Sequence, residues 1–266
     1  MNQKTLPTSD RSSFDYKNLA EAEEKYWWFV ARRRIVREMV RHLEAPSLQK
    51  TIVDVGCGTG ANAAALAKDY RCIGVDYSEE AIRLARLRFP GVPFFCGAVL
   101  NDFKELMEPA SVFLLLDVLE HIEEDRMFLE SLLKVARPGS HFLITVPADP
   151  RLWGEYDVRC GHYRRYEPDR LASLWKGQPV TARLLSYFCM RLYPAIWAFR
   201  AIHRFRGRRP EVAREETDVP PAPLNLLLER IFFGESKVLV ELLEGRRQQG
   251  FSFGSSLMAV LRREEG

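Results

Sequence analysis

Three glycines and two aspartates have the spacing of a nucleoside-binding site. Gly56, Gly58 and Gly60 follow the β-branched run of residues 51–55, which favours a buried parallel strand. Glycines let the backbone turn sharply and approach a ligand closely. Asp54 precedes the first glycine by two residues, and Asp76 ends the next predicted strand. We expect the Asp76 carboxylate to accept hydrogen bonds from both ribose hydroxyls of an adenosine.

The charge of Asp54 helps to separate the two cofactors that such a site could hold. The same glycines, with Ala61, also satisfy the dinucleotide pattern G-x-G-x-x-G/A. A dinucleotide places its pyrophosphate at the helix N-terminus, where an acid adds repulsion. S-adenosylmethionine carries an ammonium and a sulfonium instead, and both attract a carboxylate. A nicotinamide-dependent oxidoreductase is the less favoured alternative.

The segment from Asp54 to Gly60 resembles the acid-x-Gly-x-Gly-x-Gly motif of class I S-adenosylmethionine-dependent methyltransferases. Residues 112–121 resemble the fourth strand and following loop of their small-molecule branch, which includes ubiquinone-type O-methyltransferases and uncharacterised bacterial relatives. Residues 137–140 are similar to the Lys-Pro-Gly-Gly turn of that branch. The resemblance implies an α/β fold: a Rossmann-like, seven-stranded, mostly parallel sheet with an antiparallel last strand and helices on both faces.

The resemblance also implies a set of cofactor-binding residues. Asp54 would lie near the amino group of S-adenosylmethionine, and Asp76 would bind its ribose. The other residues expected to contact the cofactor are Gly56, Cys57, Gly58, Gly60, Tyr77, Asp102 and Asp117. The family often has an acid after the third strand for the adenine, whereas Ala98 follows Gly97 here. The adenine contact is therefore open, with Asn101, Asp102 and the backbone near Ala98 as candidates.

The rest of the sequence supplies the elements that position these residues. Residues 19–43 predict a helix, broken near Tyr26, that packs as a lid over the cofactor with an arginine-rich, mostly solvated face. The predicted strands are 51–55, 72–76, 93–96, 112–117, 140–146, 179–186 and 255–262, and the helices between them are 60–69, 78–88 and 124–136. This alternation indicates a parallel sheet covered on both sides. Residues 1–17 are expected to be disordered, 18–186 with 254–264 to form the core, and 187–253 to form a helical insertion or cap.

Residues 153–166 combine aromatic and basic side chains without an apolar period. We expect a loop beyond the carboxyl ends of the strands, where substrates bind in this fold. Its predicted substrate-binding residues are Trp153, Tyr163, Arg164 and Tyr166. His162 in this loop, and then His121, have the ordinary pKa of a general base near neutrality. An arginine-anchored surface loop is the alternative, and no metal-binding set is predicted.

Residues 187–209 join an apolar, aromatic stretch to several arginines. The arginines prevent it from spanning a bilayer comfortably. One interpretation is peripheral contact with anionic headgroups, which fits a lipid-linked acceptor. The other is a cap on the domain or on a second subunit, with a small-molecule acceptor.

Composition limits the remaining function classes. At 266 residues and 47% hydrophobic content, the chain can bury one substantial core. A net charge of +3 is too small to favour nucleic acid as a partner. The five cysteines form no C-x-x-C pair, and the N-terminus lacks the apolar stretch of a signal peptide. We expect a cytoplasmic methyltransferase, most readily an O-methyltransferase; a cofactor-binding interaction module without activity is the alternative, and the oligomeric state is open.

Overall fold

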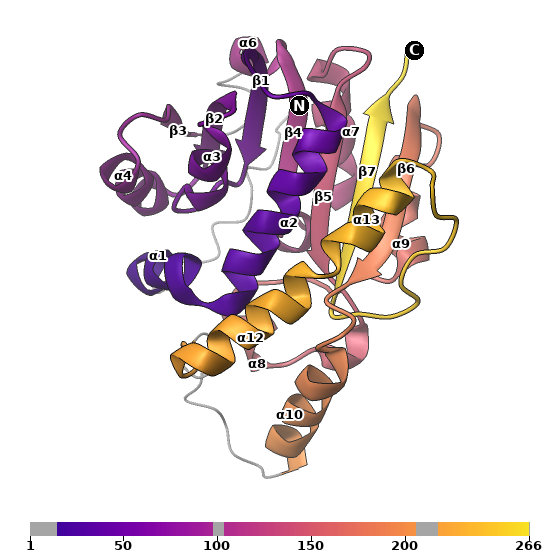
Figure 1. Cartoon of the computed structure of the whole chain (residues 1–266). Coiled ribbons are helices and arrows are strands. Elements are labelled where there is room, and N and C mark those ends of the chain that lie inside the picture. The colour runs from indigo at the N-terminus through magenta and orange to yellow at the C-terminus, as the bar shows by residue number, and fades with distance from the viewer. Residues whose placement is uncertain (1–14, 98–103, 206–217, 266) are drawn as a thin grey trace.

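The computed structural model describes residues 15–97, 104–205 and 218–265, and its centre is a seven-stranded sheet (Figure 1). The strands are β1 (Ser47–Val55), β2 (Tyr70–Asp76), β3 (Phe94–Cys96), β4 (Ala110–Leu116), β5 (His141–Pro147), β6 (Val180–Phe188) and β7 (Ser256–Arg263). Their order is β3-β2-β1-β4-β5-β7-β6, with β7 antiparallel to β5 and β6. The predicted sheet, including its antiparallel last strand, is confirmed. The order reverses between β1 and β4, and ligands bind at such a switch point.

Helices cover both faces of the sheet (Figure 1). One face is covered by α2 (Trp27–Leu43), α3 (Ala61–Leu66), α4 (Glu79–Arg88), α12 (Ala222–Phe233) and α13 (Ser236–Leu243). The other face is covered by α6 (Lys104–Met107), α7 (Asp125–Val135) and α9 (Pro168–Ala172). Three further described helices lie toward the carboxyl edge of the sheet: α1 (Tyr16–Lys25), α8 (Glu155–Arg159) and α10 (Tyr193–Phe205). Short 3-10 turns lie between elements, namely η2 (Leu119–His121), η3 (Pro150–Leu152) and η4 (Ser173–Trp175).

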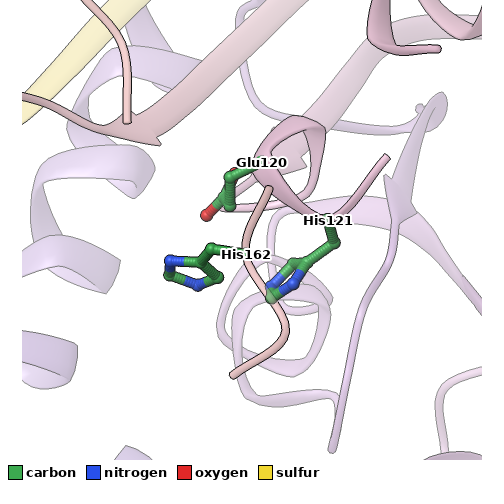
Figure 2. A group of neighbouring side chains, drawn as sticks. All are labelled: Glu120, His121 and His162. Carbon is green, nitrogen blue, oxygen red and sulfur yellow. The ribbon is translucent and has the colours of Figure 1, made fainter. Parts of the chain in front are cut away.

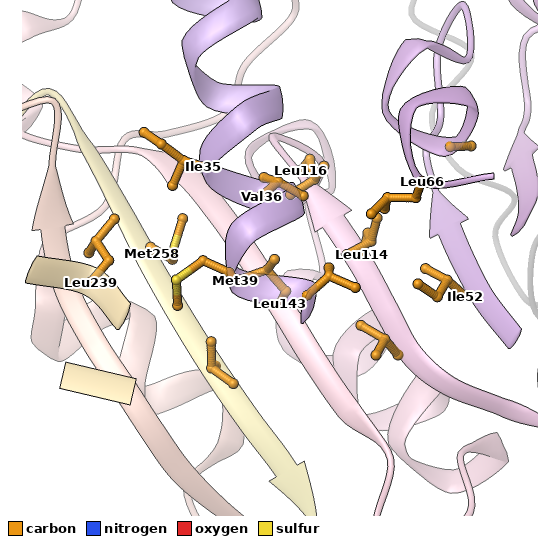
Figure 3. Close-up of a cluster of buried hydrophobic side chains, with 14 of the residues drawn as sticks. Ile35, Val36, Met39, Ile52, Leu66, Leu114, Leu116, Leu143, Leu239 and Met258 are labelled. Atoms are coloured by element: carbon orange, nitrogen blue, oxygen red, sulfur yellow. The ribbon is translucent and has the colours of Figure 1, made fainter. Parts of the chain in front are cut away.

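Successive residues of the central strands point into two separate cores. Leu114 packs on the α2 side and Leu115 on the α7 side, and Leu143 and Ile144 divide in the same way. Figure 3 shows the α2 side, where Met39 lies over the sheet. All seven residues of β4 are buried. Burial of both faces explains why the sequence of this strand is a nearly continuous apolar run.

The predicted N-terminal helix is divided into α1 and α2, as expected, at Tyr26. Its ψ of 128° is extended, so the chain changes direction there. The first helix begins earlier than predicted: Asp15 accepts a hydrogen bond from Asn18 N (3.0 Å) and caps α1. Tyr16 and Lys17 are therefore helical rather than disordered, and residues 1–14 of the predicted segment 1–17 lie outside the described residues.

The described residues of the insertion between β6 and β7 form α10, α12 and α13. In this insertion α12 ends at Phe233 and α13 begins at Ser236, and between them the buried carboxylate of Glu235 accepts a hydrogen bond from Arg191 N (2.8 Å). Pro194 does not kink α10, since it lies in the first turn, where its missing N–H has no partner to lose. Within the described residues, no helix is both long and apolar enough to cross a membrane.

Leu143→Ala tests the role of the α2-side core. Because Leu143 is fully buried, its truncation should lower the free energy of unfolding by about 2–5 kcal/mol. Leu48→Ala is the matched control, since Leu48 is 68% exposed and should change stability by less than about 0.5 kcal/mol. Urea unfolding followed by circular dichroism measures both, and equal losses would contradict this description of the core.

Candidate functional site

A cavity of about 1040 Å³ lies at the carboxyl edge of the sheet. It is lined by Gly56 and Gly58 after β1, by Asp76 and Tyr77 at the end of β2, and by Asp117 after β4. Residues of α1, α2, α10 and the segment 153–166 close its sides. Its size is at the upper end for small-molecule sites, so a cofactor and a second ligand can share it.

Two glycines of the first loop have different physical roles. A Cβ at Gly58 would meet no atom closer than 3.9 Å, so this residue presents open backbone to the cavity. A Cβ at Gly60 would lie 2.6 Å from the ring of Phe94, and its φ is +88°. Gly60 does not line the cavity. It is required for the turn into α3 and for close packing behind the loop.

Asp76 joins the glycine loop to the end of β2. Its Oδ2 accepts a hydrogen bond from Gly58 N (2.9 Å), and its Oδ1 accepts one from Ser78 N (2.9 Å). A carboxylate oxygen can accept more than one hydrogen bond. The position at the cavity wall therefore fits the predicted ribose contact.

Asp54 is a buried acid with an unsatisfied oxygen. It is 1% exposed, and its Oδ2 has no hydrogen-bond partner among the described residues. Burial raises the pKa of Asp54 to about 7, against the opposing charge of Arg32. Asp54 precedes the cavity-lining glycines on β1 and does not itself line the cavity. Its unpaired oxygen favours a cation nearby.

Arg32 on α2 is buried rather than solvated, unlike the predicted arginine face. Its guanidinium donates to Asp117 Oδ2 and lies 4.7 Å from the ring centre of Trp28. Thr145 Oγ1 donates to the other oxygen of Asp117 (3.2 Å). Burial lowers the pKa of Arg32 to about 10, against the charges of Glu23 and other acids. Arg32 and Asp117 thus connect the lid, formed by α1 and α2, to β4.

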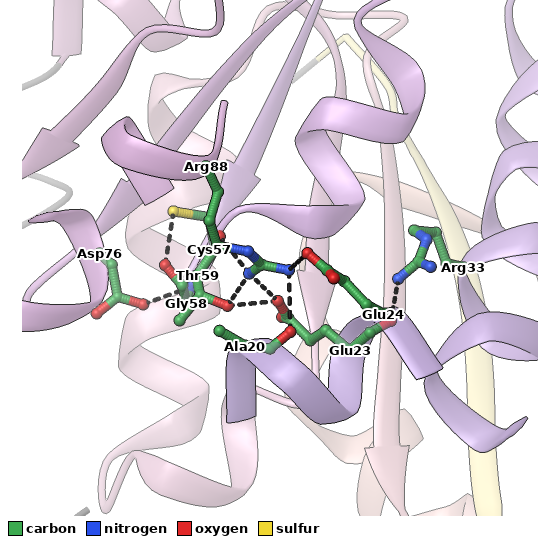
Figure 4. Close-up of polar contacts among 9 residues, drawn as sticks. All are labelled: Ala20, Glu23, Glu24, Arg33, Cys57, Gly58, Thr59, Asp76 and Arg88. Carbon is green, nitrogen blue, oxygen red and sulfur yellow. Dashed lines mark hydrogen bonds and ion pairs between the residues drawn. The ribbon is translucent and has the colours of Figure 1, made fainter. Parts of the chain in front are cut away.

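A second set of polar contacts fixes α1 to the glycine loop (Figure 4). Arg88 of α4 donates to Glu23 Oε2 (2.7 Å), to Thr59 O (2.9 Å) and to Ala20 O (3.1 Å). Thr59 Oγ1 also donates to Glu23 Oε2. Since Glu23 itself lines the cavity, these contacts hold the lid in place over the loop.

The segment 153–166 contains a short helix, α8, where only a loop was predicted. The buried carboxylate of Asp157 organises it, accepting from Gly154 N, His162 Nδ1 and Arg165 Nε, each at 2.9 Å. Burial alone would raise the pKa of Asp157, but the hydrogen bond from His162 and the charge of Arg165 lower it to about 2. His162 is held against an ionised acid in this way.

His162, His121 and Glu120 gather on one wall of the cavity (Figure 2). The two imidazole ring centres are 4.6 Å apart. Glu120 is fully buried, and neither of its oxygens has a hydrogen-bond partner among the described residues. Burial raises the pKa of Glu120 to about 8. Both histidines were predicted from the sequence as candidate bases, whereas Glu120 and Asp157 were not predicted as site residues. For Glu120 the available signal was its position directly before His121 in the sequence.

The four predicted substrate-binding residues lie outside the cavity lining. Tyr166 is buried and donates to Asp125 Oδ2 (2.8 Å), and Arg164 forms an ion pair with the same carboxylate (2.7 Å). Trp153 and Tyr163 are more than a third exposed. The segment instead contributes Tyr156, Cys160, His162 and Arg165 to the cavity. Among the predicted cofactor residues, Cys57 and Tyr77 line the cavity, and Asn101 and Asp102 lie outside the described residues.

Comparisons with known proteins identify the domain that carries this cavity. Residues 53–144 match the family model described as a methyltransferase domain. The chain is 33% identical over 130 residues to a protein of Mycolicibacterium smegmatis named "Probable S-adenosylmethionine-dependent methyltransferase", covering 47% of each chain. The chain therefore contains a methyltransferase domain and is similar to S-adenosylmethionine-dependent methyltransferases.

One further relative and one solved structure are also similar to this chain. The ubiquinone biosynthesis O-methyltransferase of Proteus mirabilis is 26% identical over 169 residues, which cover 58% of this chain and 68% of the relative. The solved plantazolicin methyltransferase BpumL, in complex with SAH, matches with a TM-score of 0.57 at 15% identity, over 94% of this chain and 90% of BpumL. BpumL shows the shared fold. The chain spans about half the length of the Mycolicibacterium relative.

The match to a methyltransferase domain favours S-adenosylmethionine as the cofactor over a nicotinamide cofactor. The residues present fit S-adenosylmethionine: Gly58 gives open backbone, Asp76 has its carboxylate at the cavity wall, and Asp54 has an uncompensated buried oxygen. When bound, the cofactor supplies an electrophilic methyl group on a sulfonium. The chain's own residues bind and orient it.

Cofactor binding should release a proton through Asp54. The pKa of this buried carboxyl is about 7, and a nearby ammonium group favours the ionised form and lowers that pKa. Affinity for S-adenosylhomocysteine should therefore rise with pH up to about 7. Calorimetry at pH 6.5 in two buffers of different ionisation enthalpy measures the proton release. Asp54→Asn should abolish this proton release. Asp69→Asn is the control, because Asp69 pairs with Arg37 and Arg41 away from the cavity, and it should preserve the release. Equal proton release by the two variants would contradict the assignment to Asp54.

Arg88→Met should weaken cofactor binding by releasing α1 from the glycine loop. We expect about a tenfold loss of S-adenosylhomocysteine affinity, equivalent to ~1.4 kcal/mol. Arg83→Met is the control on the same helix. Arg83 pairs with the exposed Glu80 of α4, so this variant should keep the wild-type affinity. Fluorescence titration gives both dissociation constants, and equal affinities would show that these contacts do not hold the lid.

Proposed function

We propose that this protein transfers the methyl group of S-adenosylmethionine to a hydroxyl of a small-molecule or lipid-linked acceptor. The main support is that one cavity joins the glycine loop to His121 and His162. Methyl transfer is an in-line displacement, so the acceptor must lie beyond the methyl group as seen from the sulfur. The part of the cavity past Asp117, toward the histidines, is suited to hold it.

The reaction forms one O–C bond and breaks one C–S bond. The acceptor oxygen attacks the methyl carbon, S-adenosylhomocysteine leaves as a neutral thioether, and the acceptor hydroxyl loses its proton. Orientation within the cavity can contribute ~7–11 kcal/mol, and assisted proton loss about 10²–10⁴-fold. His162, oriented by Asp157, and His121 beside it are the side chains proposed to activate the hydroxyl.

The insertion supports an acceptor with an apolar part. Leu192, Ile196 and Phe199 line the cavity, together with Leu228 of α12. Further apolar side chains on α10 and α12 are at least 44% exposed, namely Trp197, Ile202, Leu224, Leu226 and Leu227. An apolar cavity wall continuous with an exposed apolar surface suits a lipid-linked acceptor. The same proposal includes a cytoplasmic location and peripheral membrane contact through 187–209. Part of that segment lies outside the described residues.

His162→Ala and Asp76→Ala should separate catalysis from cofactor binding. The first should lower turnover by about 10²-fold or more with S-adenosylhomocysteine affinity kept, and the second should weaken cofactor affinity severely. The assay follows transfer of radiolabelled methyl groups into small-molecule and lipid extracts, with binding measured by calorimetry. Full turnover by His162→Ala would remove its proposed role. Cofactor binding without transfer to either extract would favour the non-catalytic interaction module.

A further inference from the structure

We propose that Glu120, His121 and His162 bind a divalent transition-metal ion beside the methyl donor, and that this ion binds the acceptor oxygen. One potential ligand atom from each residue lies within 4.8 Å of the others. All three residues line the cavity (Figure 2). The inference rests on the proposed function and specifies how the acceptor hydroxyl is activated.

Glu120 is the residue that most requires a cation. Its side chain is fully buried, and both carboxylate oxygens lack a hydrogen-bond partner among the described residues. A buried carboxylate without a partner is strongly unfavourable unless a positive charge compensates it. A metal ion on the cavity side would provide that charge and would use oxygen atoms that the protein leaves unsatisfied.

The contact between His162 and Asp157 prepares the imidazole to bind metal. A carboxylate only accepts hydrogen bonds, so His162 Nδ1, 2.9 Å from Asp157 Oδ1, carries the proton. The metal-ligating atom of this ring is then Nε2. Metal-binding histidines in general donate their other N–H to a carboxylate or carbonyl, which fixes the ring and the tautomer. Asp157 therefore acts as a positioning residue for the ligand.

The backbone holds the two ligand-bearing segments together before any ion binds. Tyr163 N, next to His162, donates to the carbonyl oxygen of Glu120 (2.7 Å). Arg165 donates to Asp157 and to Ala148 O (3.1 Å), so the segment is also attached to the end of β5. Ligands separated by about forty residues in sequence are thus kept in one arrangement, as a metal site requires.

The ligand types select the class of metal. Two imidazoles and one carboxylate suit zinc and other first-row divalent ions, whereas magnesium and calcium prefer oxygen ligands. Three protein ligands also leave a coordination position open, which is the arrangement of catalytic sites. An acceptor hydroxyl at that position would have a lowered pKa and lose its proton to solvent. His162 then acts as a ligand, and no proton transfer to it is needed.

Metal binding can be tested separately from activity. Chelator-treated full-length protein, saturated with S-adenosylhomocysteine, is titrated in separate experiments with Zn²⁺, Mn²⁺ and Mg²⁺ by calorimetry. We expect one Zn²⁺ per chain and much weaker binding of Mg²⁺. Glu120→Gln and His162→Ala should each lower Zn²⁺ affinity at least 100-fold, and Asp157→Asn should lower it 10–100-fold. His42→Ala is the control. His42 is exposed in the last turn of α2, so this variant should bind Zn²⁺ with unchanged affinity.

A spectroscopic measurement keeps the test independent of folding defects. Co²⁺ bound in place of Zn²⁺ should give a visible absorption band in the wild type that His162→Ala loses, while circular dichroism and S-adenosylhomocysteine affinity show that the variant is folded. Absence of stoichiometric binding by folded wild type, or unchanged affinity in both Glu120→Gln and His162→Ala, would overturn the metal site. Full turnover by metal-free protein would overturn its role. Either result leaves the proposed methyl transfer standing if labelled product still forms.

Discussion

The structure depends on the accumulation of buried acidic groups at the carboxyl edge of the sheet. Asp54, Asp76 and Glu120 are all less than a tenth exposed, and each belongs to a different strand end or following turn. The buried guanidinium of Arg32 lies near Asp54 and Glu120 and donates a hydrogen bond to Asp117. Buried negative charge that the protein leaves uncompensated must be matched by a ligand or by protons. A cofactor that carries a sulfonium and an ammonium has the right sign for this edge.

The same electrostatics explains how the lid is attached. α1 and α2 are held through charged hydrogen bonds to the site itself: Arg32 reaches Asp117, and Glu23 binds Arg88 and Thr59 next to the glycine loop. Charge-assisted hydrogen bonds in partly buried positions are stronger than surface pairs. The contacts that attach the lid are therefore also contacts of the candidate cofactor site. The insertion completes the enclosure by adding apolar side chains of α10 and α12 on the acceptor side.

Local patterns predicted the sheet and the cofactor half of the site because each of their signals is confined to a few neighbouring residues. The β-branched run before Gly56, the acid at the end of β2 and the apolar β4 all report strands buried on both faces. The acceptor half was less predictable. Aromatic and basic residues in 153–166 suggested substrate contacts, but Tyr166 and Arg164 are used to anchor the segment on Asp125. A polar side chain in a loop can face either way, and composition does not distinguish these orientations.

By itself the sequence determined the fold class, the antiparallel last strand implied by the family resemblance, and the glycine loop with its two aspartates. These features follow from backbone conformation and from burial on a regular period, both of which are local. Only the tertiary structure decided that Arg32 is buried, that Asp157 holds His162, and that Glu120, His121 and His162 share one wall of a cavity. Such contacts join residues from separate elements, and their distances are set by how the helices and the long segment after β5 pack on the sheet.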